Sequence, residues 1–174
     1  HWALKEPRLC VLLPIFQSAL TRPLAVIVLR HPIEIARSLR RRNGFPMRAG
    51  LALWEAYMTS ALRHSNSLDR VFIDYHEIVA DPSGALSRLE GQLETLGVSG
   101  LDLKSGVRAI SPELRRERLG DGPNDKLLSR AQSSLWNVLA DHAPEETKTL
   151  RLSDDAVDVL REFEADEGTR RRVQ

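Results

Sequence analysis

One short stretch of the chain is apolar at every position. Residues 24–29 read Leu-Ala-Val-Ile-Val-Leu and are rich in β-branched side chains, a pattern typical of a strand buried on both faces of a parallel sheet. Arg30 ends this strand, and Pro32 stands where the first residue of a helix is expected. An apolar stripe then continues to a stop at Asn43-Gly44. The pattern predicts a strand, a tight turn and a helix.

The same reading extends through the next fifty residues. Apolar positions recur every three or four residues between about Met47 and His64, which predicts a second helix, and residues 71–75 predict a second strand. Asp81 and Pro82 then read as the cap and first turn of a helix that ends near Gly97. Because helices and strands alternate, we expect an α/β fold in which helices flank a parallel sheet in three layers.

The remaining residues show weaker and mostly helical signals. Asn124 is placed to cap a helix that runs to about residue 140, and Ser153 is placed to cap a last, acidic helix. We therefore expect a single domain over residues 1–174, with an α/β part in residues 1–97 and a mostly helical part in residues 98–174.

The start of the chain is ambiguous in the sequence. Residues 2–5 fit the end of a strand, and residues 9–20 fit a short helix broken near Pro14. The first residue is His1, and no basic segment followed by an apolar one comes after it. We interpret the chain as a processed or partial one, with the cytoplasm as its default location.

Composition narrows the possible classes of protein. The chain of 174 residues is 42% hydrophobic and 28% charged, which fits one globular domain, and no apolar run approaches the roughly 20 residues that span a bilayer. The single cysteine, Cys10, excludes an internal disulfide and every Cys-x-x-Cys motif, and the histidines lack the spacing of metal ligands, so no metal is expected. Nucleic acid is also not expected, because the charge is nearly balanced and only three of the arginines of residues 37–48 are consecutive.

The charge is unevenly distributed along the chain. Residues 1–80 hold eleven Lys and Arg against six Asp and Glu, whereas residues 81–174 are net acidic. An anion-binding site is therefore expected in the first half. The 21 arginines against 4 lysines fit forked contacts with anions and fit genomic codon bias equally well.

The predicted strand, turn and helix place two candidate anion ligands close in sequence. Arg30 stands at the carboxyl end of the strand, and Ser38 lies two turns into the helix. Ligands of open α/β sheets bind at the carboxyl ends of the strands, where an arginine fork and a hydroxyl can hold a phosphate. The alternative is an ordinary one, in which Arg30 pairs with a surface carboxylate such as Glu34 and Ser38 faces solvent.

The block Arg30-His31-Pro32-Ile33-Glu34-Ile35-Ala36-Arg37-Ser38 also has a recognisable context. Read with Lys5-Glu6-Pro7-Arg8 before it, and with Asp74-Tyr75-His76-Glu77 and Asp81-Pro82 after it, the block resembles the sulfotransferases that use 3′-phosphoadenylyl sulfate (PAPS). The likeness is closest to bacterial members with a Lys-Asp-Pro-Arg segment, and it covers residues 2–97.

The resemblance implies roles for individual residues. Arg30 and Ser38 would hold the 3′-phosphate of the nucleotide, and Tyr75 would lie near the adenine. Lys5 would approach the sulfate and offset the negative charge that grows on the leaving phosphate. Animal cytosolic members of the family have a histidine base two residues after this lysine, where this chain has Pro7. Glu6 is then the nearest candidate base, or it orients Lys5 or Arg8.

Two further features depart from the family pattern. No Gly-rich loop that could cradle the 5′-phosphosulfate occurs in these residues, so we interpret the chain as a C-terminal portion of a longer enzyme whose activity alone is doubtful. Family members end with an Arg-Lys-Gly segment that contacts the 3′-phosphate. Here Pro112-Glu113-Leu114-Arg115-Arg116 stands instead, and Arg115 and Arg116 either contact the nucleotide or lie on a solvated helix face.

The resemblance implies a sulfotransferase with a P-loop-like α/β fold. It would transfer a sulfuryl group directly from PAPS, its co-substrate, to a hydroxyl or amine of a small molecule or glycan. The alternatives are a relative of the P-loop kinases, or a nucleotide-binding or interaction module without turnover. The acceptor and the oligomeric state stay open.

Overall fold

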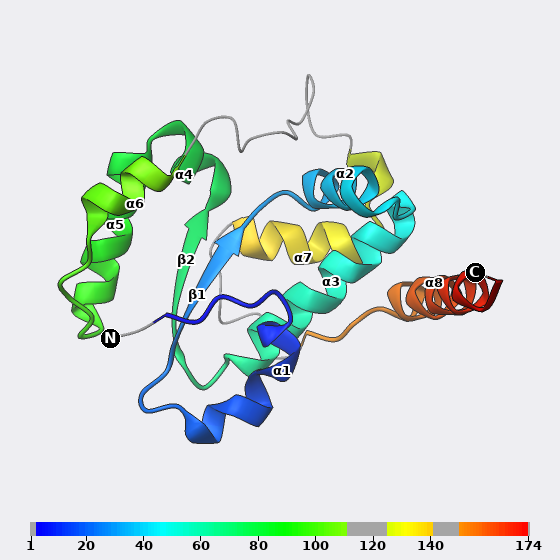
Figure 1. Ribbon diagram of the computed structural model, residues 1–174, viewed down its shortest axis with the longest axis horizontal. Helices are drawn as coiled ribbons and strands as arrows, with labels where there is room; N and C mark the ends of the chain where they lie inside the picture. Colours follow the sequence, from blue (N-terminus) through cyan, green and yellow to red (C-terminus); the bar gives the residue numbers. More distant parts are fainter. Residues whose placement is uncertain (1–2, 111–124, 141–149, 174) are drawn as a thin grey trace. The chain divides into compact units, whose positions relative to one another are not determined.

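The computed structural model describes residues 3–110, 125–140 and 150–173 (Figure 1). The chain forms two compact units, each built from two separate stretches. The first unit comprises His1–Arg30 and His64–Arg116, and the second comprises His31–Arg63 and Glu117–Gln174. The fold is mixed α/β and mostly helical, and every element described beyond residue 97 is a helix. The predicted single domain with a division at residue 97 stays a prediction.

The first unit contains a pair of parallel strands. Strand β1 (Leu24–Leu29) pairs with β2 (Asp69–Asp74) in a register that matches Leu24 with Asp69 and Leu29 with Asp74. The predicted strand and its parallel pairing are confirmed. Within the described part of the chain these two strands form the whole sheet, which is compatible with an α/β fold.

The two faces of β1 differ in exposure. Ile27 and Leu29 are buried, whereas Val26 and Val28 are 43% and 47% exposed. The expectation that both faces are buried is therefore wrong for these two valines, because successive side chains of a strand point to opposite faces. An all-apolar run shows that a strand suits a buried position, but it does not show which face the surrounding elements cover.

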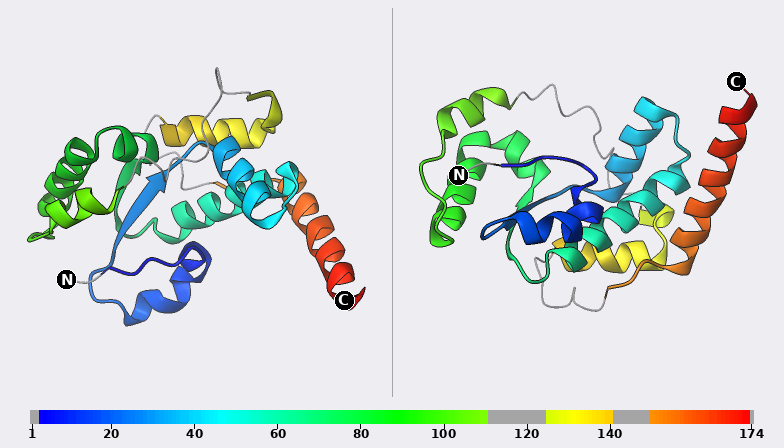
Figure 2. Two further views of the ribbon diagram at one scale, coloured as in Figure 1. Left: turned by 45° about the horizontal axis from the view of Figure 1, so that its top comes forward. Right: turned by 60° about the horizontal axis from the view of Figure 1, so that its bottom comes forward.

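Three helices pack together beside β2 in the first unit. They are α4 (Tyr75–Ala80), α5 (Pro82–Thr95) and α6 (Leu103–Ala109), and Figure 2 shows them from two sides. The predicted helix after Asp81 is confirmed as α5, whose cap is the Asp81 carboxylate accepting from the Gly84 N–H at 3.0 Å. A second contact joins α4 to α5, since Arg88 lies 3.1 Å from Glu77.

The helix near the start of the chain runs through its proline. Helix α1 (Leu9–Phe16) includes Pro14 and is followed by a short 3-10 turn, Gln17–Ala19, so the predicted break near Pro14 comes two residues later. Pro14 has no N–H to donate to the carbonyl of Cys10 one turn earlier. His64 supplies that donor instead, with its Nδ1 atom 2.7 Å from the Cys10 oxygen, and this bond satisfies the carbonyl that the proline leaves without a helical partner.

The second unit contains four helices and a 3-10 turn among its described residues: α2 (Pro32–Asn43), α3 (Met47–His64, whose last residue falls in the first unit), the turn Asp125–Leu127, α7 (Arg130–Ala140) and α8 (Asp154–Val173). The predicted ends of α2 and α3 are confirmed, and Gly44 closes α2 with a φ of 72° that disfavours other residues.

Helix α7 begins later than predicted. The predicted cap, Asn124, lies outside the described residues, and the α-helix starts at Arg130. Ser129 and Gln132 form reciprocal bonds there: the Ser129 hydroxyl accepts from the Gln132 N–H, and the Gln132 side chain accepts from the Ser129 N–H. This is a capping box, so the pair Ser129 and Gln132 sets the start of the helix.

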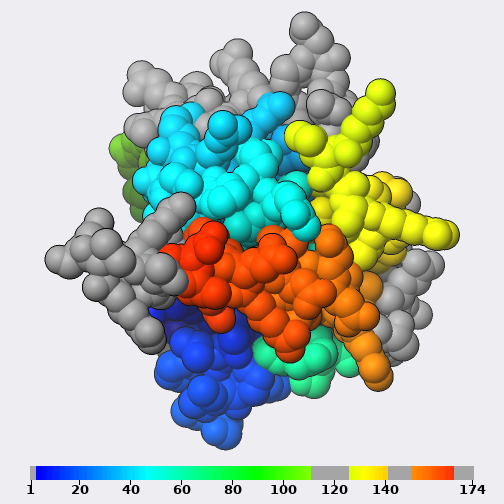
Figure 3. Space-filling model, turned by 90° about the vertical axis from the view of Figure 1, so that its right-hand side faces the viewer, coloured from blue at the N-terminus to red at the C-terminus, as the bar shows by residue number. Residues whose placement is uncertain are grey.

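Small side chains let α8 approach α3 closely. Ala49 and Ala52 of α3 share a buried cluster with Ala156 and Val159 of α8, and the two helices lie against each other in the space-filling view (Figure 3). The predicted cap of α8 is confirmed, since the Ser153 hydroxyl accepts from the Ala156 N–H. The Ser153 N–H in turn donates to the buried carboxylate of Glu55 at 2.9 Å.

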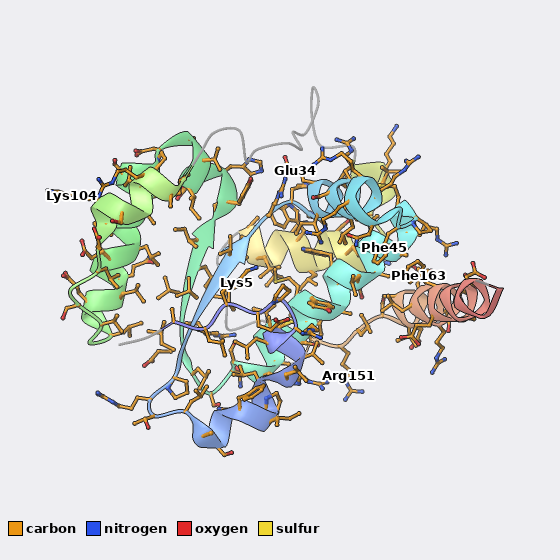
Figure 4. All side chains as sticks on the ribbon, in the orientation of Figure 1. Lys5, Glu34, Phe45, Lys104, Arg151 and Phe163 are labelled. Atoms are coloured by element: carbon orange, nitrogen blue, oxygen red, sulfur yellow. The ribbon has the colours of Figure 1, made fainter. Side chains whose placement is uncertain are left out.

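Two aromatic rings add to the contact of α8. Phe45, in the turn before α3, meets Phe163 edge to face with ring centroids 4.7 Å apart (Figure 4). Such an aromatic pair stabilises the folded protein by roughly 0.5–1.5 kcal/mol beyond the effect of the area it buries.

None of the helices in the described part of the chain has both the length and the apolar character that crossing a membrane requires.

Candidate functional site

The strongest candidate site lies at the carboxyl ends of the paired strands. Because Leu29 and Asp74 are the last matched pair of the register, Arg30 and Tyr75 leave the sheet side by side. The guanidinium carbon of Arg30 lies 4.3 Å from the centre of the Tyr75 ring. This is cation–π geometry, and it joins two residues for which the resemblance implies contacts with one nucleotide.

Asp74 determines how Tyr75 is presented. Its carboxylate accepts from the N–H groups of His76 and Glu77 and so caps α4. Tyr75 is therefore the first residue of a helix, and the prediction that the strand continues to residue 75 is wrong by one residue. The sequence Asp-Tyr-His-Glu carries the signal, since an aspartate followed three residues later by a glutamate is typical of a helix start.

Lys5 and Glu6 lie in the segment before α1. The expected strand end at residues 2–5 is not found in the described residues 3–5, which carry no regular structure. Among the described strands, β1 pairs only with β2. Lys5 is exposed (Figure 4). The Glu6 carboxylate accepts from the Arg8 side chain at 2.8 Å and from the Arg8 N–H at 3.1 Å.

These contacts bear on Glu6 as a base. The hydrogen bond from the Arg8 side chain, followed by the one from its N–H group, lowers the pKa of Glu6 below its ordinary value. A carboxylate with a lowered pKa is a weaker proton acceptor. Glu6 would also have to exchange its contact with Arg8 for the acceptor hydroxyl.

The Glu6 contact gives a testable titration. In the protein Glu6 is expected to stay ionised at a lower pH than an ordinary glutamate, and Arg8→Ala should raise the pKa of Glu6, because the hydrogen bond from the Arg8 side chain is then lost. Any stabilisation from this contact is present above the ordinary pKa and fades as the pH falls through the lowered one. The measurement is an NMR titration of the Glu6 carboxyl carbon. Lys5→Ala is the control, since Lys5 contributes least to the lowering of the Glu6 pKa. An unchanged Glu6 pKa in Arg8→Ala would show that the hydrogen bond from Arg8 is not the cause of the lowered pKa.

The other predicted phosphate ligand lies in the second unit, which the chain enters between Arg30 and His31. Ser38 is a half-buried residue near the middle of α2. The start of that helix is held by His31, whose Nδ1 accepts from the Ile33 N–H at 3.3 Å and whose ring meets Trp136 of α7 edge to face, with centroids 5.0 Å apart. Glu34 is 0% exposed, so it is not a surface carboxylate, and its pairing with Arg30 stays an open alternative because the two residues belong to different units.

Some assignments lie beyond what the structure places together. Arg115 and Arg116 are outside the described residues. The pairing of Arg30 with Ser38 on one phosphate stays a prediction, because the two residues belong to different units. The contact of Trp136 with His31 was missed by the sequence analysis, and no local pattern announces it because it joins helices far apart in the chain.

Two other kinds of site, a nucleophilic cysteine and a metal-binding cluster, find no support in the described residues. Burial raises the pKa of the Cys10 thiol, whose sulfur lies 3.4 Å from the Pro7 carbonyl oxygen, so this cysteine is a poor nucleophile. No group of three or more His, Cys, Asp or Glu in the described part of the chain is placed to hold a metal ion.

Comparisons of the chain with protein-family models, with curated proteins and with solved structures find no match.

Proposed function

We propose that this chain binds the nucleotide of PAPS and belongs to an enzyme that transfers the sulfuryl group to a hydroxyl or amine acceptor. The observation that carries the proposal is the contact of Arg30 with Tyr75 at the carboxyl ends of two parallel strands. Open α/β sheets bind nucleotides at this edge. The resemblance of residues 2–97 to PAPS-dependent sulfotransferases supplies the identity of the nucleotide.

The Arg30–Tyr75 pair suits both parts of a 3′-phosphorylated adenosine. The N–H donors of a guanidinium lie in its own plane, where they can fork onto a phosphate while the group lies over an aromatic ring. The tyrosine ring offers an aromatic surface beside that phosphate position for the adenine base. In the proposal Arg30 and Ser38 hold the 3′-phosphate and Tyr75 contacts the base.

The proposed chemistry is a direct transfer. The acceptor oxygen or nitrogen attacks the sulfur in line, the bond from sulfur to the bridging phosphate oxygen breaks, and the acceptor proton goes to a base. Lys5 would balance the charge on the departing phosphate, and Glu6 would take the proton or orient Arg8. A three-layer, P-loop-like sheet and a cytoplasmic location are the finer parts of the same proposal.

The first test is binding, since residues 1–174 contain no Gly-rich phosphate loop. The chain is titrated calorimetrically with 3′,5′-adenosine bisphosphate, with 5′-AMP and with ATP. We expect the bisphosphate to bind at least tenfold more tightly than 5′-AMP, because one charge-assisted contact is worth roughly 1.5–3 kcal/mol. Equal affinities or no binding would contradict the proposal, and tightest binding of ATP would favour a relative of the kinases.

A further inference from the structure

Helix α2 ends in a cluster of arginines. Arg40, Arg41 and Arg42 form its last turn, and all three are exposed. The one acidic residue of this helix, Glu34, is buried. The exposed part of the last turn is therefore strongly positive.

The three arginines differ in their position relative to Ser38. Successive residues of an α-helix are turned by about 100°, so residues three and four positions apart are neighbours on one face. Arg41 and Arg42 follow Ser38 by three and four positions and share its face. Arg40 follows by two positions and is turned about 200° away from it.

A phosphate beside Ser38 needs cations that the helix backbone does not provide. Ser38 lies inside α2, where its N–H belongs to the helical hydrogen-bond pattern, so only its neutral hydroxyl can donate to a ligand. The carboxyl half of a helix also carries the negative end of its dipole, which repels an anion. Arginines one turn further along the same face supply the missing positive charge.

Arg42 is additionally oriented by a hydrogen bond at the end of the helix. Its Nε atom donates to the Asn43 side chain at 2.9 Å. This bond uses the inner nitrogen of the fork, and a guanidinium has further N–H donors on its two outer nitrogens. The side chain is thus held near the helix end by its inner nitrogen, and the N–H groups of the two outer nitrogens are not used in that bond.

We propose that Arg41 and Arg42 bind the 3′-phosphate of the nucleotide together with Ser38. The inference rests on the proposed function and extends it, because it adds two phosphate ligands beside Ser38 on the same helix. The competing explanation is that these arginines only complement the helix dipole, as cations near a carboxyl end do. That effect does not depend on which face an arginine occupies, so it applies to Arg40 as well.

The test compares three substitutions that remove the same charge. Arg40→Gln, Arg41→Gln and Arg42→Gln each lose one positive charge from one helix turn, and glutamine keeps a similar helix propensity. Each variant is titrated with 3′,5′-adenosine bisphosphate and with 5′-AMP. We expect about a tenfold loss of bisphosphate affinity for Arg41→Gln and for Arg42→Gln, a change below about twofold for Arg40→Gln, and no selective effect on 5′-AMP.

The outcomes separate the two proposals. Equal losses in all three variants would show a general field of positive charge and would overturn the inference. If the unaltered chain prefers the bisphosphate but neither Arg41→Gln nor Arg42→Gln weakens it, the inference fails and the proposed function stands. If the unaltered chain does not distinguish the two nucleotides, the proposed function fails and the inference falls with it. Circular dichroism of each variant checks that α2 remains folded.

Discussion

Arg30→Ala is expected to abolish the preference of the chain for 3′,5′-adenosine bisphosphate over 5′-AMP. The guanidinium lies 4.3 Å from the centre of the Tyr75 ring, at the end of the sheet where the strands present their carboxyl termini. Removing it deletes a forked, charged donor to the proposed 3′-phosphate. We expect a loss of at least about 1.5 kcal/mol, or more than tenfold in affinity.

A matched arginine lies at the other end of the same strand pair. The guanidinium carbon of Arg70 lies 5.9 Å from the centre of the Phe72 ring, near the start of β2. Arg70→Ala removes the same charge and another cation–π contact from the same sheet. Its affinity for the bisphosphate should change by less than about twofold, because its end of the sheet is opposite to the proposed site.

The comparison of the two variants decides the position of the site. Calorimetric titrations of the unaltered chain and of both variants with both nucleotides give the affinities that are needed. A loss of similar size in Arg70→Ala would mean that the effect comes from overall charge or from damage to the sheet. An unchanged preference for the bisphosphate in Arg30→Ala would show that Arg30 does not bind the 3′-phosphate, and it would contradict the proposed function.

Gly50→Val is expected to destabilise the second unit by about 2–3 kcal/mol. Gly50 is a buried residue of α3, and a Cβ atom there would lie 3.0 Å from the Cα of Ala36 in α2 and 3.1 Å from its Cβ. One of these neighbours is a backbone atom, so it cannot rotate away. The two helices would have to separate, which would disturb the cluster of Ile33, Ala36 and Leu51.

A second helical glycine provides the control. Gly91 lies inside α5, and a Cβ atom there meets nothing within 4 Å. Gly91→Val should be neutral or slightly stabilising, because valine has a higher helix propensity than glycine. Urea unfolding followed by circular dichroism measures both variants. A Gly50→Val protein as stable as Gly91→Val would show that α2 and α3 do not approach as closely as described.

Several elements of the fold were predictable because their signals are local. Pro32 and Gly44 set the two ends of α2, and Ser153 set the start of α8. The start of α7 was also predictable, since Ser129 and Gln132 have capping-box spacing, which is a stronger signal for a helix start than Asn124 alone. Helices α4 and α6 were missed because each spans two turns or fewer, too few for an apolar stripe to show.

The candidate site was predictable only in part. Arg30 and Tyr75 were both placed at strand ends by the sequence, but their contact depends on the register that matches Leu29 with Asp74. A shift of the pairing would separate them along the edge of the sheet. The Glu6–Arg8 bond joins residues two positions apart, so it was predictable as one of the roles of Glu6.

The sequence by itself determined where the main helices and strands lie and which residues carry charge near their ends, because capping, proline and glycine act within a few residues. Only the tertiary structure decided that Arg30 lies over the Tyr75 ring, that Val26 and Val28 stay exposed, and that Glu55 binds the start of α8. Contacts of this kind join residues far apart in the chain. They depend on strand register and on which faces the neighbouring elements cover, and neither is encoded in a local pattern.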